Sequence, residues 1–173
     1  NKVLTKVKPQ TTSSTVVYIH ESAAMQKNDL PLINELKKQH YTIISYDLPT
    51  KKTATYEVAV KEWTKDLNKI VGNKQVVVIG HSMGGAVATH FCSIDKRCVA
   101  GVNVDGIPID EKISPPFLHL QTEKKVKILG SATHNASNSA IKDASTPRPK
   151  EAKEIINKQI VAFLQKTVEK KPK

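Results

Sequence analysis

The chain has 173 residues, of which 39% are hydrophobic and 25% are charged, as in an ordinary globular domain with a buried core. No apolar run approaches the ~20 residues that span a bilayer. The net charge is +11, yet Arg97 and Arg148 are the only arginines. Proteins that read nucleic acids depend on arginine forks and stacked aromatic rings. We therefore expect no nucleic acid partner, and we interpret the charge as a solvated lysine surface or, second, as attraction to anionic membrane surfaces.

Strands and helices are predicted to alternate along the chain. Short apolar runs, which are typical of strands buried in a parallel sheet, alternate with segments that have apolar residues at helical spacing. The predicted strands are Thr15–His20, Tyr41–Asp47, Gln75–Gly80, Cys98–Asp105, Phe117–Gln121 and Lys125–Gly130. The predicted helices are Leu30–Gln39, Tyr56–Val71, Ala86–Ile94 and Glu151–Val168. The pattern predicts one α/β domain over residues 1–173, with a mostly parallel sheet flanked by helices.

The connection between the last two predicted strands is unusually short. Parallel neighbours need a crossover of about a dozen residues or more, and no such length separates Gln121 from Lys125. Either these strands are not parallel neighbours, or a segment is missing or deleted near residues 121–125.

A glycine-rich segment contains the candidate nucleophile. Residues 80–84 read Gly-His-Ser-Met-Gly, directly after one predicted strand and before a predicted helix. A Gly-x-Ser-x-Gly pattern in that context predicts a nucleophile elbow, where a strained turn exposes the serine. Ser82 is the candidate nucleophile, and the backbone N–H of Met83, at the positive end of the helix, is a candidate oxyanion donor. The alternative is a merely structural glycine-rich turn.

A serine nucleophile needs a histidine base, and three histidines follow Ser82. His134 lies in a loop after the predicted strand Lys125–Gly130, at the sheet edge where ligands bind. We predict that His134 is the base, with a solvent-exposed loop histidine as the alternative. His90 lies within a predicted helix and His119 within a predicted strand, so we interpret both as structural.

Two carboxylates are candidates for the residue that orients the base. Asp105 ends the predicted strand Cys98–Asp105, and Glu123 follows the strand Phe117–Gln121. We prefer Asp105 and keep Glu123 as the alternative acid. The second oxyanion donor is expected from the loop after an early strand, where the N–H of Ser22 is the best candidate, next to Glu21.

The two cysteines lie on either side of a predicted helix-to-strand turn. Such a turn can bring Cys92 and Cys98 close enough for a disulfide, which would require an oxidising compartment. We therefore expect a secreted or periplasmic protein, or a cytoplasmic one if the thiols are free.

The segments VVVIGHSMGGAVA, DKRCVAGVNVDG and THNASNSA together resemble the α/β-hydrolase family. Within it they are similar to a lidless branch that includes platelet-activating-factor acetylhydrolases and bacterial dienelactone hydrolase-like or chlorophyllase-like esterases. The resemblance covers nearly the whole chain and implies a fold with no cap domain. It implies that Asp105, in Asp-Gly-Ile-Pro, is the acid and that His134 is the base. The sequence departs from the family at His20-Glu21, where His-Gly is frequent, so Glu21 would narrow or perturb the oxyanion hole.

These features predict a serine hydrolase that cleaves small-molecule or lipid esters through an acyl-enzyme, with no metal and no organic cofactor. A phospholipid-directed acylhydrolase is an alternative within this class. The rival class is a non-catalytic binding protein with the same fold.

Overall fold

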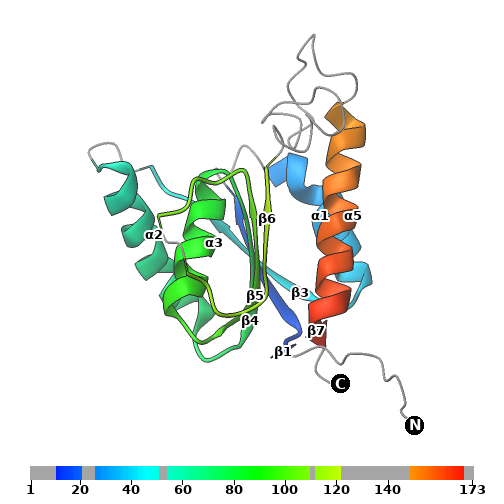
Figure 1. The fold of residues 1–173 in the computed structure, drawn as a ribbon, viewed down its shortest axis with the longest axis horizontal. Helices are drawn as coiled ribbons and strands as arrows, with labels where there is room; N and C mark the ends of the chain where they lie inside the picture. Colours follow the sequence, from blue (N-terminus) through cyan, green and yellow to red (C-terminus); the bar gives the residue numbers. More distant parts are fainter. Residues whose placement is uncertain (1–10, 21–25, 51–53, 110–111, 122–148, 170–173) are drawn as a thin grey trace.

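The computed structural model describes residues 11–20, 26–50, 54–109, 112–121 and 149–169 (Figure 1). The strands are β1 (Thr11–Thr12), β2 (Thr15–His20), β3 (Thr42–Asp47), β4 (Val76–His81), β5 (Cys98–Val104), β6 (Phe117–Leu120) and β7 (Val168–Glu169). The helices are α1 (Gln26–Lys38), α2 (Tyr56–Val71), α3 (Met83–Ile94) and α5 (Pro149–Thr167). The predicted strand Lys125–Gly130 and the question of a missing segment near residues 121–125 lie outside the described residues.

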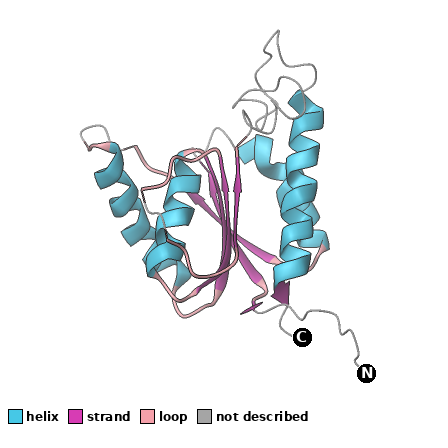
Figure 2. Ribbon diagram, viewed as in Figure 1, coloured by secondary structure: helices cyan, strands magenta, loops and turns pink. Residues whose placement is uncertain are grey.

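Five parallel strands form the central sheet in the order β3-β2-β4-β5-β6. Helices α1 and α5 cover one face of the sheet, and α2 and α3 cover the other (Figure 2). The order places β4 at the centre, where all its residues are buried. The sheet confirms the predicted α/β architecture, and its central strand leads directly into the segment that contains Ser82.

The alternation of side chains along β4 divides the core into two layers. Val77 and Ile79 pack with α1 and α5, whereas Val76 and Val78 pack with α2 and α3. The apolar faces predicted for α1, α2 and α5 are directed into these layers. This two-sided burial explains why the strand is apolar at successive positions instead of alternating with polar residues.

Three helices begin earlier than the sequence predicted, and the smallest difference is at α5, which begins at Pro149 instead of Glu151. Helix α1 begins at Gln26 instead of Leu30. The sequence pattern does not show this start, because the first turn is polar and lacks the apolar spacing that marks a helix. Helix α3 begins at Met83 instead of Ala86, so its first turn includes Gly84 and Gly85. The earlier start of α3 brings its N-terminus directly against Ser82.

The crossover from β5 to β6 contains no helix or strand within its described residues. It runs along the side of the sheet covered by α2 and α3, where Ile109 and Ile113 pack against the core. The Tyr56 hydroxyl donates a hydrogen bond of 2.7 Å to the Ile107 carbonyl and ties this crossover to α2. An extended crossover therefore carries the chain from Asp105 back to the start of β6.

The predicted disulfide between Cys92 and Cys98 is confirmed, with a Cα–Cα distance of 5.1 Å. It joins the last turn of α3 to the first residue of β5. Arg97 stabilises the same connection, because its guanidinium pairs with Asp95 at 2.6 Å and donates to the Gly72 carbonyl at 2.6 Å. The two elements that flank the candidate site are thus joined at their far ends.

Candidate active site

Ser82 lies in a strained turn between β4 and α3. Its backbone φ is 56° and its ψ is −122°. Among the described non-glycine residues only His40, Ser82 and Asp105 have a positive φ, and two of these three are predicted site residues. A non-glycine residue adopts such a conformation only where its surroundings impose it, and such strain is concentrated at functional sites.

The glycines around Ser82 are required by close backbone contacts. A Cβ on Gly80 would lie 2.0 Å from the Gly84 carbonyl oxygen, and a Cβ on Gly84 would lie 2.5 Å from the Ile19 carbonyl oxygen. Neither gap accommodates a methyl group. The Gly-x-Ser-x-Gly pattern therefore has a direct steric cause in this fold.

The elbow is anchored to β5 and leaves its side chain available. The Ser82 N–H donates to the Val104 carbonyl at 2.7 Å, and the Ser82 carbonyl accepts from Gly85 and Ala86. The Ser82 hydroxyl makes no capping bond to α3, although Ser82 occupies the N-cap position. Met83 is in the first turn of α3, where backbone N–H groups lack intrahelical acceptors. These features suit a half-exposed nucleophile beside an oxyanion donor.

Asp105 follows β5 beside the elbow. Its φ is 63°, and its N–H donates to the Leu120 carbonyl at 2.8 Å. The Asp105 side chain is 5% exposed, and its Oδ2 lies 4.0 Å from Nε2 of His81. The structure thus places Asp105 at the carboxyl edge of the sheet, near the residue that precedes Ser82.

Three of the predicted site residues, His134, Glu123 and Ser22, lie outside the described residues. His90 lies in α3, beside a cavity of about 230 Å³ that Thr64 and Phe91 also line. His119 lies on β6, with its Nδ1 3.4 Å from Nδ2 of Asn103, and burial lowers its pKa. Ser82, Met83 and Asp105 are therefore the predicted residues that the structure brings to one edge.

A buried cluster that the sequence analysis did not identify surrounds Asp29. One Asp29 oxygen lies 2.7 Å from Nδ1 of His20, and the other accepts from the Tyr18 hydroxyl at 2.9 Å and lies 3.9 Å from Nζ of Lys153. Burial raises the pKa of Tyr18, as does the Asp29 charge. Burial lowers the pKa of Lys153, and the Asp29 charge opposes that change. The other ring nitrogen of His20, Nε2, is buried without a partner within the described part of the chain.

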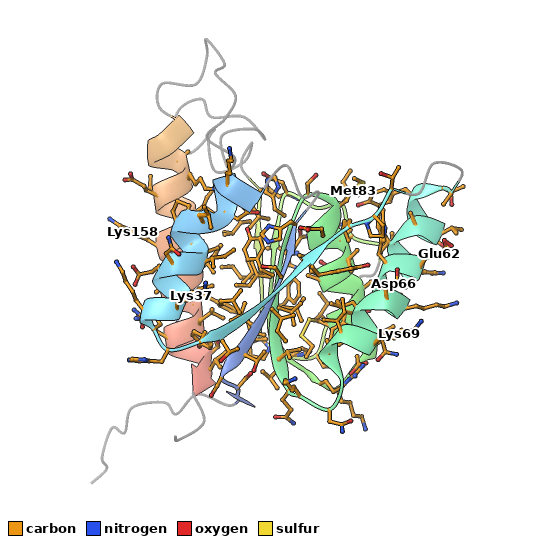
Figure 3. All side chains as sticks on the ribbon, turned by 180° about the vertical axis from the view of Figure 1, so that it is seen from behind. Lys37, Glu62, Asp66, Lys69, Met83 and Lys158 are labelled. Carbon is orange, nitrogen blue, oxygen red and sulfur yellow. A yellow bond between two sulfur atoms is a disulfide. The ribbon has the colours of Figure 1, made fainter. Side chains whose placement is uncertain are left out.

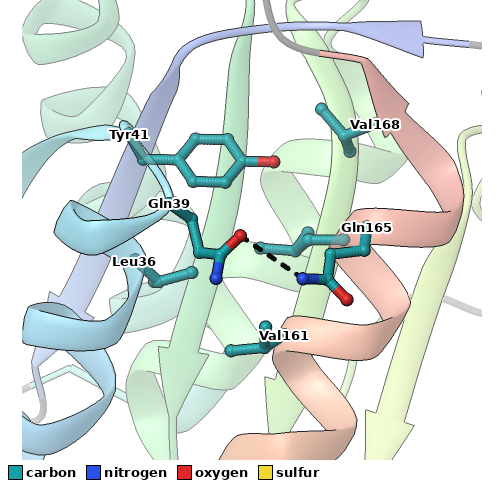
Figure 4. Close-up of a pocket in the computed structure, with 7 residues that line it drawn as sticks. Leu36, Gln39, Tyr41, Val161, Gln165 and Val168 are labelled. Atoms are coloured by element: carbon teal, nitrogen blue, oxygen red, sulfur yellow. Dashed lines mark hydrogen bonds between the residues drawn. The ribbon is translucent and has the colours of Figure 1, made fainter.

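The pocket drawn in Figure 4 lies between α1 and α5 and contains none of the predicted site residues. Its volume is about 260 Å³, and Tyr41, Val161 and Leu164 contribute to its walls. A hydrogen bond of 3.3 Å from Gln165 to Gln39 crosses it. We do not assign it to the chemistry of Ser82.

Within the described ranges, no group of three or more His, Cys, Asp or Glu side chains is arranged to hold a metal ion. None of the helices in the described part of the chain is both long and apolar enough to cross a membrane.

A family model described as the alpha/beta hydrolase fold matches residues 16–170. No curated protein is a significant match to the sequence. Three similar solved structures are a ferulic acid esterase from Streptomyces cinnamoneus, an esterase from Pyrococcus furiosus and an acylaminoacyl peptidase from Pyrococcus horikoshii. The TM-scores are 0.55, 0.56 and 0.56, at sequence identities of 17%, 16% and 11%.

These alignments cover most of this chain but different shares of the other proteins. The aligned part is 93%, 88% and 96% of this chain, and 50%, 81% and 39% of the three structures, in the same order. The chain therefore spans about half the length of the ferulic acid esterase. At these identities the likeness concerns the fold.

Proposed function

Since the chain belongs to the α/β-hydrolase family, we propose that it is a serine hydrolase that cleaves carboxylic esters. The observation that carries this proposal is the strained conformation of Ser82 between β4 and α3. The Ser82 hydroxyl makes no capping bond, and the neighbouring turn holds the buried carboxylate of Asp105. A nucleophile and an acid are thus supplied by adjacent strands at the edge where ligands bind in parallel sheets.

In the proposed reaction, the Ser82 hydroxyl attacks the ester carbonyl and forms an acyl-enzyme as the alcohol leaves. His134 takes the serine proton and transfers it to the leaving alcohol. Asp105 holds the imidazole in the tautomer that this transfer needs. Water then attacks the acyl group, again with His134 as the base, and restores free Ser82.

The oxyanion of the tetrahedral intermediate would be stabilised by backbone donors. The Met83 N–H lies in the first turn of α3 and benefits from the positive end of the helix dipole. The Ser22 N–H is the proposed second donor. In comparable sites one such donor contributes roughly 2.7–4 kcal/mol to transition-state stabilisation.

The proposed substrate class is small or lipid esters. Two of the three similar structures are esterases and the third is an acylaminoacyl peptidase, so ester hydrolysis is the class with more support among them. The resemblance to platelet-activating-factor acetylhydrolases makes a phospholipid-like ester the more specific candidate. The disulfide supports secretion, because such bonds persist mainly in oxidising compartments.

The first test of the proposed function is whether Ser82 reacts. We expect a fluorophosphonate probe to label the wild type at Ser82. We expect Ser82→Ala to abolish both labelling and hydrolysis of p-nitrophenyl acetate. Ser93→Ala is the matched control, because Ser93 lies at the other end of the same helix and bonds the His90 carbonyl. A folded wild type that neither labels nor turns over would favour the non-catalytic binding protein.

A further inference from the structure

Asn103 is a buried amide between the acid turn and the elbow. It lies on β5, is 3% exposed, and is directed to the side of the sheet covered by α3. Its Oδ1 accepts from the Gly106 N–H at 2.7 Å, and its Nδ2 donates to the Gly106 carbonyl at 3.0 Å. Two hydrogen bonds to one residue close the turn that contains Asp105.

The backbone partners define which way the amide points. The Gly106 N–H can only donate and the Gly106 carbonyl can only accept, so Oδ1 and Nδ2 of Asn103 cannot be exchanged. Aspartate at this position would keep the acceptor and lose the donor. Leucine would lose both, although its size is similar. Among residues of this size, only asparagine makes both bonds.

The same amide fills the space between the turn and α3. A Cβ on Gly85 would lie 2.0 Å from Oδ1 of Asn103. A Cβ on Gly106 would lie 2.6 Å from the same oxygen and 2.4 Å from the Ser82 carbonyl oxygen. Two glycines thus allow the acid turn, the amide and the elbow to be in direct contact.

We propose that Asn103 is the positioning residue that closes the Asp105 turn and holds it against the Ser82 elbow. The expected effect of Asn103 on kcat rests on the proposed function, whereas its role in closing the turn does not. Asp105 has a left-handed backbone, which costs energy for a residue with a side chain. The two bonds to Gly106 supply a local reason for that conformation. A third contact of the Asn103 amide, from Nδ2 to Nδ1 of His119, joins the turn to β6.

The kinetic test compares Asn103→Leu and Asn103→Asp with the wild type on p-nitrophenyl acetate. We expect kcat to fall about 100-fold for Leu and less for Asp, with KM changed by less than about threefold, because misplacement of a catalytic group acts on the chemical step. Thr64→Val is the control, because it removes a buried hydrogen bond within α2, from the Thr64 hydroxyl to the Val60 carbonyl. Its kcat should stay at the wild-type value. A kcat unchanged in both Asn103 variants would overturn the inference.

A double mutant shows whether Asn103 acts through Asp105. If it does, adding Asn103→Asp to Asp105→Asn should lower kcat by less than about threefold further, because the acid is already lost. If the loss of kcat in the double mutant equalled the product of the two single losses, Asn103 would act independently of Asp105. That result would overturn the positioning role.

A measurement without substrate separates this inference from the proposed function. Amide hydrogen exchange at Gly106 should be faster in the Asn103→Leu variant than in the wild type, in Asn103→Asp and in Thr64→Val. The expected difference is about tenfold or more, since leucine removes the acceptor of the Gly106 N–H, which aspartate keeps. Equal exchange rates would overturn the inference even in an active enzyme. Faster exchange would support it even if the wild type hydrolysed no ester.

Discussion

At the scale of single residues, the identity of the acid determines how the site works. Asp105 is held near the elbow with its side chain 5% exposed. We expect Asp105→Asn to lower kcat by about 10⁴-fold, the loss seen when the base is left in the wrong tautomer. Glu123→Gln should lower kcat by less than about threefold. Both variants should be assayed on one soluble ester, with circular dichroism as the control for folding. The reverse order of effects would transfer the acid role to Glu123.

The glycine contacts at the elbow give a second prediction at this scale. Gly80→Ala places a methyl group 2.0 Å from a backbone oxygen, and the backbone must move to admit it. We expect a loss of about 3 kcal/mol or more in the free energy of unfolding, as for severe overpacking. Gly72→Ala is the matched control. Gly72 has a φ of 61° and no atom within 4 Å of the added Cβ, so the expected cost is backbone strain alone, about 1–3 kcal/mol.

Urea titration of both glycine variants measures these differences. Equal destabilisation of the two would show that the elbow tolerates the methyl group.

The elbow was predictable from sequence because its pattern is local. The contact that requires Gly80 is with Gly84, which is close in the chain, although the contact that requires Gly84 is with the distant Ile19. The role of Asn103 is not predicted from the sequence, because the pattern of Cys98–Asp105 indicates only a buried strand. The polar residue within that run was the available signal. Asn103 also lies against Gly85, which is distant from it in the chain. No local sequence pattern shows such a contact.

At the scale of elements, Asp29 joins β2, α1 and α5. It carries two short contacts, to His20 and Tyr18, and a longer one of 3.9 Å to Lys153. Removing one partner of a buried charge pair costs about 3–5 kcal/mol. We therefore expect Asp29→Leu to be strongly destabilising in thermal or urea unfolding.

Removing Lys153 separates charge pairing from packing in this cluster. Lys153→Met alone should cost less than about 1.5 kcal/mol, because Asp29 keeps its two short contacts. Adding Lys153→Met to Asp29→Leu should recover stability, since the buried ammonium then disappears. Strict additivity of the two changes would contradict the pairing.

The elements themselves were largely predictable, and the exceptions have a common cause. The apolar periodicity located α2 and β4 closely, because burial on the sheet dictates it. Periodicity missed the polar first turn of α1, where Asp29 is buried by its partners instead of by apolar surface. It also missed the pairing of β1 with β7, which joins two-residue strands from opposite ends of the described chain.

At the scale of the whole molecule, strand order brings the site together. Strands β2, β4 and β5 are neighbours, and His20, Ser82 and Asp105 lie at their carboxyl ends. All three strands are parallel, so these residues meet at one edge. The disulfide lies at the opposite end of α3 and β5. The fold therefore places the disulfide at the end of α3 and β5 that is away from the candidate active site.

Lysines in the described part of the chain lie on both faces of the sheet instead of forming one stripe. Lys37, Lys69 and Lys158 belong to three helices on both faces of the sheet, and Figure 3 shows them projecting outward, with Met83 at the edge of the molecule that carries the site. A dispersed positive charge attracts anionic lipid without a defined site, by about 1 kcal/mol for each lysine near the surface. The net charge of +11 thus predicts weak association with anionic vesicles.

This association should depend on salt. The Debye length falls from about 30 Å at 0.01 M salt to about 8 Å at 0.15 M. At about 0.15 M, few of the dispersed lysines would therefore be close enough to the vesicle surface to be attracted to it. We expect co-sedimentation with vesicles of mixed phosphatidylcholine and phosphatidylserine at low salt, and its loss at physiological salt. Pure phosphatidylcholine vesicles are the control. Binding to these, or binding that persists in salt, would require an apolar insertion surface instead of dispersed charge.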